Sequence, residues 1–162
     1  MSSSRDVRKL INFLVIALVI MGGGVALGVS GVLSKDAPSI ANSVLTTAET
    51  DYNFGNIQMY DGKVSKVFTL GNSGKEDVKF TDIRTSCMCT EAVVDNAVYG
   101  MHGPYFSSAV IKPGEKKEVT VIFDPLAHGP EAVGPITRVV SIKTNSAATP
   151  MVEFKIAGNV VR

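Results

Sequence analysis

The sequence predicts an all-β sandwich that follows one N-terminal transmembrane helix. The helix is indicated by residues 10–33, which contain no charged side chain. The sandwich is indicated by apolar residues after residue 47, which recur at about every second position and are interrupted by glycine, proline and asparagine. That spacing is typical of short strands with one buried face. No segment after residue 34 has the apolar stripe of a helix.

Residues 10–33 are predicted to be an uncleaved membrane anchor. As a helix this segment would extend about 36 Å, enough to cross the roughly 30 Å hydrocarbon core of a bilayer. A cleaved signal peptide, the alternative, usually has an apolar region of only about 7–15 residues. Arg5, Arg8 and Lys9 precede the segment, and positive charge marks the cytoplasmic side. We therefore expect a single-pass protein of the cell membrane, with residues 1–9 in the cytoplasm and the chain from residue 34 outside.

Residues 34–46 are rich in serine, alanine and asparagine and are predicted to be a linker to one folded domain, residues 47–162. The alternating pattern predicts seven strands in that domain. They are Thr47–Phe54, Lys63–Leu70, Val78–Thr85, Ala109–Ile111, Glu118–Phe123, Ile136–Lys143 and Val152–Val160.

Residues that favour turns separate these strands. The first strand ends at Gly55-Asn56, the second at the run Gly71–Gly74, and the fourth at Lys112-Pro113-Gly114-Glu115. The fifth ends at Asp124-Pro125, where proline lacks the N–H that a strand ladder needs. Seven short strands in one domain of this length favour a sandwich of the immunoglobulin type.

Several motifs, in order along the chain, resemble those of the DUF1573 family. They are Asn53-Phe54-Gly55-Asn56-Ile57, Phe68-Thr69-Leu70-Gly71-Asn72-Ser73-Gly74, Ser86-Cys87-Met88-Cys89-Thr90, Ile111-Lys112-Pro113-Gly114, Val121-Ile122-Phe123-Asp124, Thr144-Asn145 and Ile156-Ala157-Gly158-Asn159-Val160. Met88 replaces the glycine usual in the third motif. The resemblance covers roughly residues 47–162 and implies an exported bacterial β-sandwich related to the immunoglobulin-like ASH/PapD-like group. It implies no settled biochemical activity.

Four side chains of metal-ligating type lie in one third of the chain. The two cysteines are Cys87 and Cys89, and the two histidines, His102 and His128, each begin a His-Gly-Pro tripeptide outside the family's core pattern. These four residues lie in three segments, namely the cysteine pair and the two histidine tripeptides. Counting strands places all three segments at one pole of the sandwich. Two thiolates and two imidazoles would suit zinc. A thioether from Met88 or Met101 would instead favour copper as Cu(I).

The same residues allow two other interpretations. Cysteine pairs of exported proteins are commonly oxidised, so Cys87 and Cys89 are also candidates for a disulfide or a redox dithiol. In an extended segment their Cα atoms would lie about 6.6 Å apart, close to the upper limit for a disulfide, so a bridge would require a local bend. Alternatively, the thiols are structural and the His-Gly-Pro tripeptides are turns. The sequence leaves these three interpretations open.

The remaining features favour binding over catalysis. The net charge of +1 includes no long block of either sign, so nucleic acid is not an expected partner. The sequence contains no phosphate-binding loop and no recognisable catalytic motif, so an enzyme is not expected. The first expectation is a membrane-anchored, non-enzymatic module that binds a protein partner at the cell surface or in the periplasm. Tyr99, Tyr105 and Phe106, in a long predicted loop, either form the binding surface or pack that loop onto the sandwich. A metal-binding protein and a thiol–disulfide redox protein are the alternatives.

Overall fold

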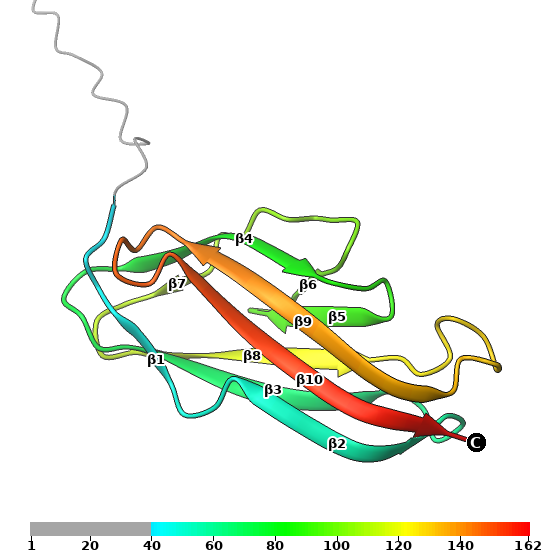
Figure 1. Cartoon of the computed structure of the whole chain (residues 1–162). Helices are drawn as coiled ribbons and strands as arrows, with labels where there is room; N and C mark the ends of the chain where they lie inside the picture. The colour runs from blue at the N-terminus through cyan, green and yellow to red at the C-terminus, as the bar shows by residue number, and fades with distance from the viewer. Residues whose placement is uncertain (1–39) are drawn as a thin grey trace, which may run out of the picture. The chain divides into compact units, whose positions relative to one another are not determined.

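The computed structural model describes residues 40–162, which form ten strands and no helix (Figure 1). Within these residues there is accordingly no helix long and apolar enough to cross a membrane. The predicted cytoplasmic segment 1–9, the predicted anchor 10–33 and the first part of the predicted linker lie outside the described residues.

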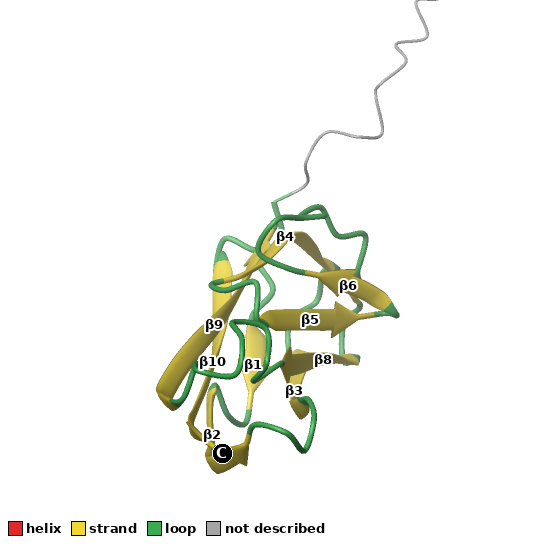
Figure 2. Ribbon diagram, turned by 90° about the vertical axis from the view of Figure 1, so that its right-hand side faces the viewer, coloured by secondary structure: helices red, strands yellow, loops and turns green. Residues whose placement is uncertain are grey.

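Two sheets of five strands each pack face to face (Figure 2). The first sheet, in spatial order, contains β1 (Leu45–Thr47), β3 (Val64–Asn72), β8 (Lys116–Phe123), β5 (Thr90–Val94) and β6 (Ala97–Tyr99). The second contains β2 (Asp51–Gln58), β10 (Met151–Val161), β9 (Gly134–Thr144), β4 (Val78–Thr85) and β7 (Val110–Ile111). Only β2 and β10 pair in parallel among these strands; the other pairs are antiparallel. The all-β class and the sandwich are therefore confirmed.

The core lies between the two sheets and follows the alternation seen in the sequence. Along β10, buried Val152, Phe154 and Ile156 alternate with exposed residues. Phe154 stacks on Phe68 of β3, with ring centroids 4.3 Å apart, so the two rings join the sheets near the centre of the core. Full burial of one such side chain contributes about 1.5–3 kcal/mol to folding.

The start of the fold differs from the prediction. The predicted first strand, Thr47–Phe54, is divided between β1 and β2, which belong to different sheets. The expected linker to residue 46 is also too long, because Ala41 forms a β-bridge with Ser146 and β1 begins at Leu45. The chain therefore joins the sandwich several residues earlier than its composition indicates.

A β-bulge explains why β2 continues beyond its predicted end. The register between β2 and β10 shifts between Ala157 and Asn159. Gly55 adopts φ +69° at this irregularity, a conformation that glycine reaches without strain. Gly158 lies opposite, where an added Cβ would come within 2.6 Å of Ile57 Cδ1. The glycine that predicts a turn thus permits a bulge, and the strand continues to Gln58.

The hairpin of β5 and β6 was not predicted from the sequence, and the long loop expected there is shorter. Val94 is joined to Ala97 by Asp95 and Asn96, whose φ angles are +49° and +65°. Positive φ at both central residues is typical of the two-residue turns that match strand twist. The Asp-Asn pair between two valine-containing runs was the local signal for this hairpin.

Two connections between the sheets lie side by side at one end of the sandwich. The β4–β5 connection leaves the second sheet for the first, and the β8–β9 connection returns from the first to the second. Because β4 pairs with β9 and β5 pairs with β8, both connections cross at the same end. This end, on the right in Figure 1, is called the disulfide pole and comprises residues 86–89 and 124–133.

Candidate functional site at the disulfide pole

Cys87 and Cys89 form a disulfide, and their Cα atoms lie 5.2 Å apart. A tight turn brings them closer than an extended segment would. Thr90 N–H donates to the carbonyl of Cys87 at 3.1 Å, and the Thr85 hydroxyl donates to the same carbonyl at 3.0 Å. The local bend required for a bridge is therefore present. Among the three interpretations of the pair, the structure contains the oxidised form.

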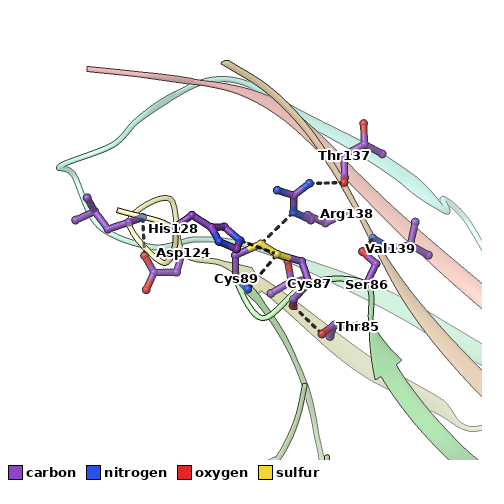
Figure 3. Close-up of a disulfide and its surroundings, with 11 residues drawn as sticks. Thr85, Ser86, Cys87, Cys89, Asp124, His128, Thr137, Arg138 and Val139 are labelled. Carbon is purple, nitrogen blue, oxygen red and sulfur yellow. Dashed lines mark hydrogen bonds between the residues drawn. A yellow bond between two sulfur atoms is a disulfide. The ribbon is translucent and has the colours of Figure 1, made fainter. Parts of the chain in front are cut away.

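His128 reaches this disulfide from the β8–β9 connection (Figure 3). Asp124 stabilises the beginning of the connection by accepting a hydrogen bond from Leu126 N–H at 2.9 Å. Gly129, with φ +86°, then turns the chain after the histidine. The Nε2 atom of His128 lies 3.1 Å from Cys87 Sγ. Because a disulfide sulfur has no proton, a hydrogen bond here requires the ring proton on Nε2.

Arg138 contacts the other sulfur and was not predicted from the sequence. Its Nε–H donates to Cys89 Sγ at 3.0 Å, and a second guanidinium N–H donates to the carbonyl of Thr137 at 2.8 Å. The strand register explains this position. Thr85 pairs with Val140, and Ser86 N–H donates to the carbonyl of Val139, so Arg138 continues the ladder beside the cysteine turn. The isolated arginine within a predicted strand, Ile136–Lys143, was the available signal.

The two cysteines differ in their exposure to solvent. Cys89 is 2% exposed and belongs to the hydrophobic core, whereas Cys87 is half-buried. Met88, between them, is 60% exposed and points away from the core. The side of the disulfide that solvent reaches is therefore the Cys87 side, where His128 is also exposed.

Three of the four predicted metal-ligating side chains lie together. The sulfur atoms of Cys87 and Cys89 and a ring nitrogen of His128 lie within 4.8 Å of one another, and His102 is not part of this group among the described residues. His102 belongs to the β6–β7 connection, residues 100–109. The β5–β6 hairpin, which was not predicted, returns the chain toward the end that it left, but His102 then follows β6 at the edge of its sheet, whereas His128 follows β8, beside β5. The two candidate thioether ligands belong to different connections, Met88 to the cysteine turn and Met101 to the β6–β7 connection next to His102.

Residues in the middle of the β6–β7 connection attach this loop to the edge of β4. Ile83 N–H donates to the carbonyl of Tyr105 at 2.8 Å, and the Tyr105 hydroxyl donates to the carbonyl of Met101 at 3.0 Å. The Arg84 guanidinium lies over the Tyr105 ring, 4.0 Å from its centroid. Hydrogen bonding to Asp82 raises the pKa of Arg84 and holds this cation in place. Tyr105 therefore attaches the loop to the sandwich.

The fold and this site define a two-sheet β-sandwich protein with a disulfide at one end, and a histidine and an arginine contact its two sulfur atoms. The chain belongs to the DUF1573 family, described as a protein of unknown function, which matches residues 45–160. The family resemblance inferred from the motifs is thus confirmed. No curated protein matches the chain.

Solved structures of similar fold include a protein of unknown function from Porphyromonas gingivalis W83, at 19% identity and a TM-score of 0.58. The match covers 74% of this chain but 48% of that one, so this chain spans about half the length of that structure. A human CEP192 ASH/PapD-like domain is 14% identical, with a TM-score of 0.48, over 78% of this chain and 89% of that domain. The secreted serine protease VesC of Vibrio cholerae is 12% identical, with a TM-score of 0.47, over 75% and 23% of the two chains. These likenesses concern the fold alone.

Proposed function

We propose that the protein is a non-enzymatic interaction module, anchored in a bacterial cell membrane by residues 10–33 and binding a protein partner outside. The single observation that carries the binding role is Phe106, which is 88% exposed on the β6–β7 connection. Apolar side chains nearby in the sequence are also exposed, Val98 at 50% and Met101 at 44%. Aromatic side chains are enriched among the residues that contribute most to protein–protein affinity.

The other aromatic residues of the predicted surface have a supporting role. Tyr99 is 4% exposed and belongs to the core, and half-buried Tyr105 attaches the loop to β4. After Phe106, Phe80 N–H donates to the carbonyl of Ala109 at 2.9 Å, so the loop that presents Phe106 is attached to the sandwich on both sides of this residue. An ordered loop loses less conformational entropy on binding, which favours affinity.

Crosslinking in cells tests this proposal. The full-length chain carries a photoreactive phenylalanine analogue at position 106 or, as the control, at Tyr60, which is 63% exposed in the β2–β3 connection. We expect one discrete protein adduct from position 106 and none of that mass from position 60. With the partner identified and purified, Phe106→Ala should weaken binding by about 30-fold or more, the size expected for a central aromatic contact. Equal adducts at both positions, or unchanged affinity, would reject this surface.

A metal site is the second candidate, favoured by the three ligand atoms that lie within 4.8 Å of one another. After reduction, two thiolates and one imidazole would suit Zn²⁺ with a water as fourth ligand, or Cu(I). Elemental analysis of the reduced full-length chain in detergent tests this candidate directly. His128→Asn should lower the metal content, whereas His102→Asn should not. Metal content that stays below one ion per ten chains, in every variant, would eliminate the candidate.

A further inference from the structure

The guanidinium of Arg138 is directed at a sulfur atom and forms no ion pair among the described residues. Its Nε lies 3.0 Å from Cys89 Sγ, and its remaining contacts are the carbonyl of Thr137 and the face of the Phe123 ring, 5.9 Å from the centroid. A permanent positive charge is thus half-buried within β9, at the fifth residue of this strand, without an ion-paired carboxylate among the described residues.

This cation matches the reduced pair better than the disulfide. A disulfide sulfur is neutral and accepts hydrogen bonds weakly, whereas a thiolate would receive a charge-assisted hydrogen bond from the same N–H. The contact therefore strengthens when the bond between the sulfurs breaks. The same positive charge opposes a second cation at Cys89, so it favours thiol chemistry over a metal ion at this position.

The exposure of the two cysteines sets the direction of attack. Cys89 is 2% exposed, so an incoming thiolate reaches Cys87, which is half-buried and adjacent to exposed His128. Attack on one sulfur of a disulfide expels the other as a thiolate, and exchange is faster when that leaving thiolate is stabilised. The leaving sulfur is then the one that Arg138 contacts.

We propose that the Cys87–Cys89 disulfide is a thiol–disulfide exchange site, with Cys87 as the sulfur attacked by an external thiol and Arg138 stabilising the leaving thiolate of Cys89. In the first step the external thiolate forms a bond to Cys87 Sγ, and the bond between Cys87 and Cys89 breaks. In the second step another thiolate attacks the external sulfur of this mixed disulfide and releases Cys87. One disulfide and two thiols yield two cysteine thiols and one external disulfide, so two electrons enter the protein. The reverse sequence oxidises a partner dithiol.

His128 acts in the second step. With its proton on Nε2, the ring lies within hydrogen-bonding distance of Cys87 Sγ, at 3.1 Å. It therefore donates to this sulfur as negative charge develops on it. The two thiolates of the reduced pair are thus stabilised by different donors, one from the β8–β9 connection and one from β9. This reaction goes beyond the proposed binding role, which rests on a different loop.

Equilibration with glutathione tests the exchange site. The full-length chain in detergent, with a chelator to remove metal ions, is incubated in buffers of increasing ratio of reduced to oxidised glutathione. The reduced fraction is measured by alkylating the thiols and weighing the intact chain by mass spectrometry. We expect the wild-type pair to be half-reduced within the accessible range of ratios. Arg138→Met should require a ratio about tenfold more reducing, because the thiolate loses a charge-assisted hydrogen bond.

Matched variants separate stabilisation of the Cys89 thiolate by Arg138 from the loss of packing that removal of any arginine side chain could cause. Arg84→Met removes an arginine of the neighbouring strand that contacts no sulfur, and it should leave the half-reduction ratio unchanged. Arg138→Lys retains the charge and should recover most of the wild-type ratio. His128→Asn should slow the release of the glutathione adduct at Cys87 about tenfold, and His102→Asn should not. A pair that glutathione cannot reduce in the folded chain, or an Arg138→Met ratio equal to that of Arg84→Met, would overturn the proposal. In a parallel sample without the chelator, recovery of a stoichiometric metal ion that blocks alkylation of both thiols would also overturn it.

Discussion

Two identical tripeptides, His102-Gly103-Pro104 and His128-Gly129-Pro130, have different surroundings in this fold. In both, the glycine has a positive φ, +102° at Gly103 and +86° at Gly129, so each tripeptide redirects the chain. His128 lies 3.1 Å from a cysteine sulfur, whereas His102 is exposed on a loop along the sandwich edge. The local sequence sets the turn, and the strands that the turn connects determine the chemistry. Both connections cross between the sheets, but among the described residues only the β8–β9 connection brings its histidine to the cysteine turn.

The largest expected effect is the protease digestion of the domain that carries both tripeptides, and it tests on which side of the membrane this domain lies. If residues 10–33 are an anchor with the cytoplasmic end at residues 1–9, protease added to spheroplasts should remove an epitope tag placed after Arg162. The loss should be nearly complete, and immunoblotting measures it. A cytoplasmic control protein must survive the same treatment. Retention of the tag while a known exported protein is digested would reverse the predicted topology.

The next effect tests whether one core holds both tripeptides in position. Phe154→Ala should lower the free energy of unfolding by about 3–5 kcal/mol, because it leaves a cavity opposite the stacked ring of Phe68. Denaturant titration of residues 40–162, followed by circular dichroism, measures the change. Phe106→Ala, at a ring that is 88% exposed, should change the same free energy by less than about 0.5 kcal/mol. Similar losses in the two variants would mean that the core does not lie where the structure places it.

A third test compares the two glycines directly. Gly103→Ala and Gly129→Ala each force a positive φ on a residue with a Cβ, so each should destabilise the domain by about 1 kcal/mol. Only Gly129→Ala should also change the rate at which glutathione reacts with Cys87, because only Gly129 follows the histidine at the disulfide. Thermal unfolding and alkylation kinetics measure the two effects. If both variants changed the rate of the glutathione reaction equally, the reactivity of Cys87 would not depend on the turn that carries His128.

The smallest expected effect separates chemistry from stability at the histidines themselves. His128→Asn and His102→Asn both alter exposed side chains, so each should change the free energy of unfolding by no more than about 0.5 kcal/mol. Denaturant titration in the oxidised state measures this. A loss well above 1 kcal/mol in His128→Asn would assign that histidine a structural role in the turn rather than a role at the sulfur.

The sequence predicts most of the scaffold because alternation is a local property. Segments such as Val78–Thr85 and Val152–Val160 carry their burial pattern residue by residue, and both form strands in the structure. The β5–β6 hairpin was missed because its runs are short and its turn residues, Asp95 and Asn96, resemble those of an ordinary loop. Gly55 was misleading for a different reason, since glycine serves a bulge as well as a turn.

The site was only partly predictable, because its contacts are set by strand register. The position of the cysteine pair and of His128 at one pole followed from counting strands. His102 is excluded because it follows β6, the edge strand of its sheet, and strand counting does not give this sideways position. Arg138 is 49 residues from Cys89 along the chain, and their contact results from the pairing of β4 with β9. Such pairings are not visible in one sequence.

The placement of the first described residues at the end opposite the disulfide pole has a mechanical consequence. Ala41 bridges to Ser146 beyond the last residue of β9, while Gly134, the first residue of β9, lies at the disulfide pole. Tension applied at residue 40 and resisted at that pole would run along the strands. The chain enters β1 at Leu45, so the β1–β3 ladder would be loaded in shear rather than broken one hydrogen bond after another from an end. A force applied between residue 40 and the disulfide pole would therefore act along the strands rather than across them.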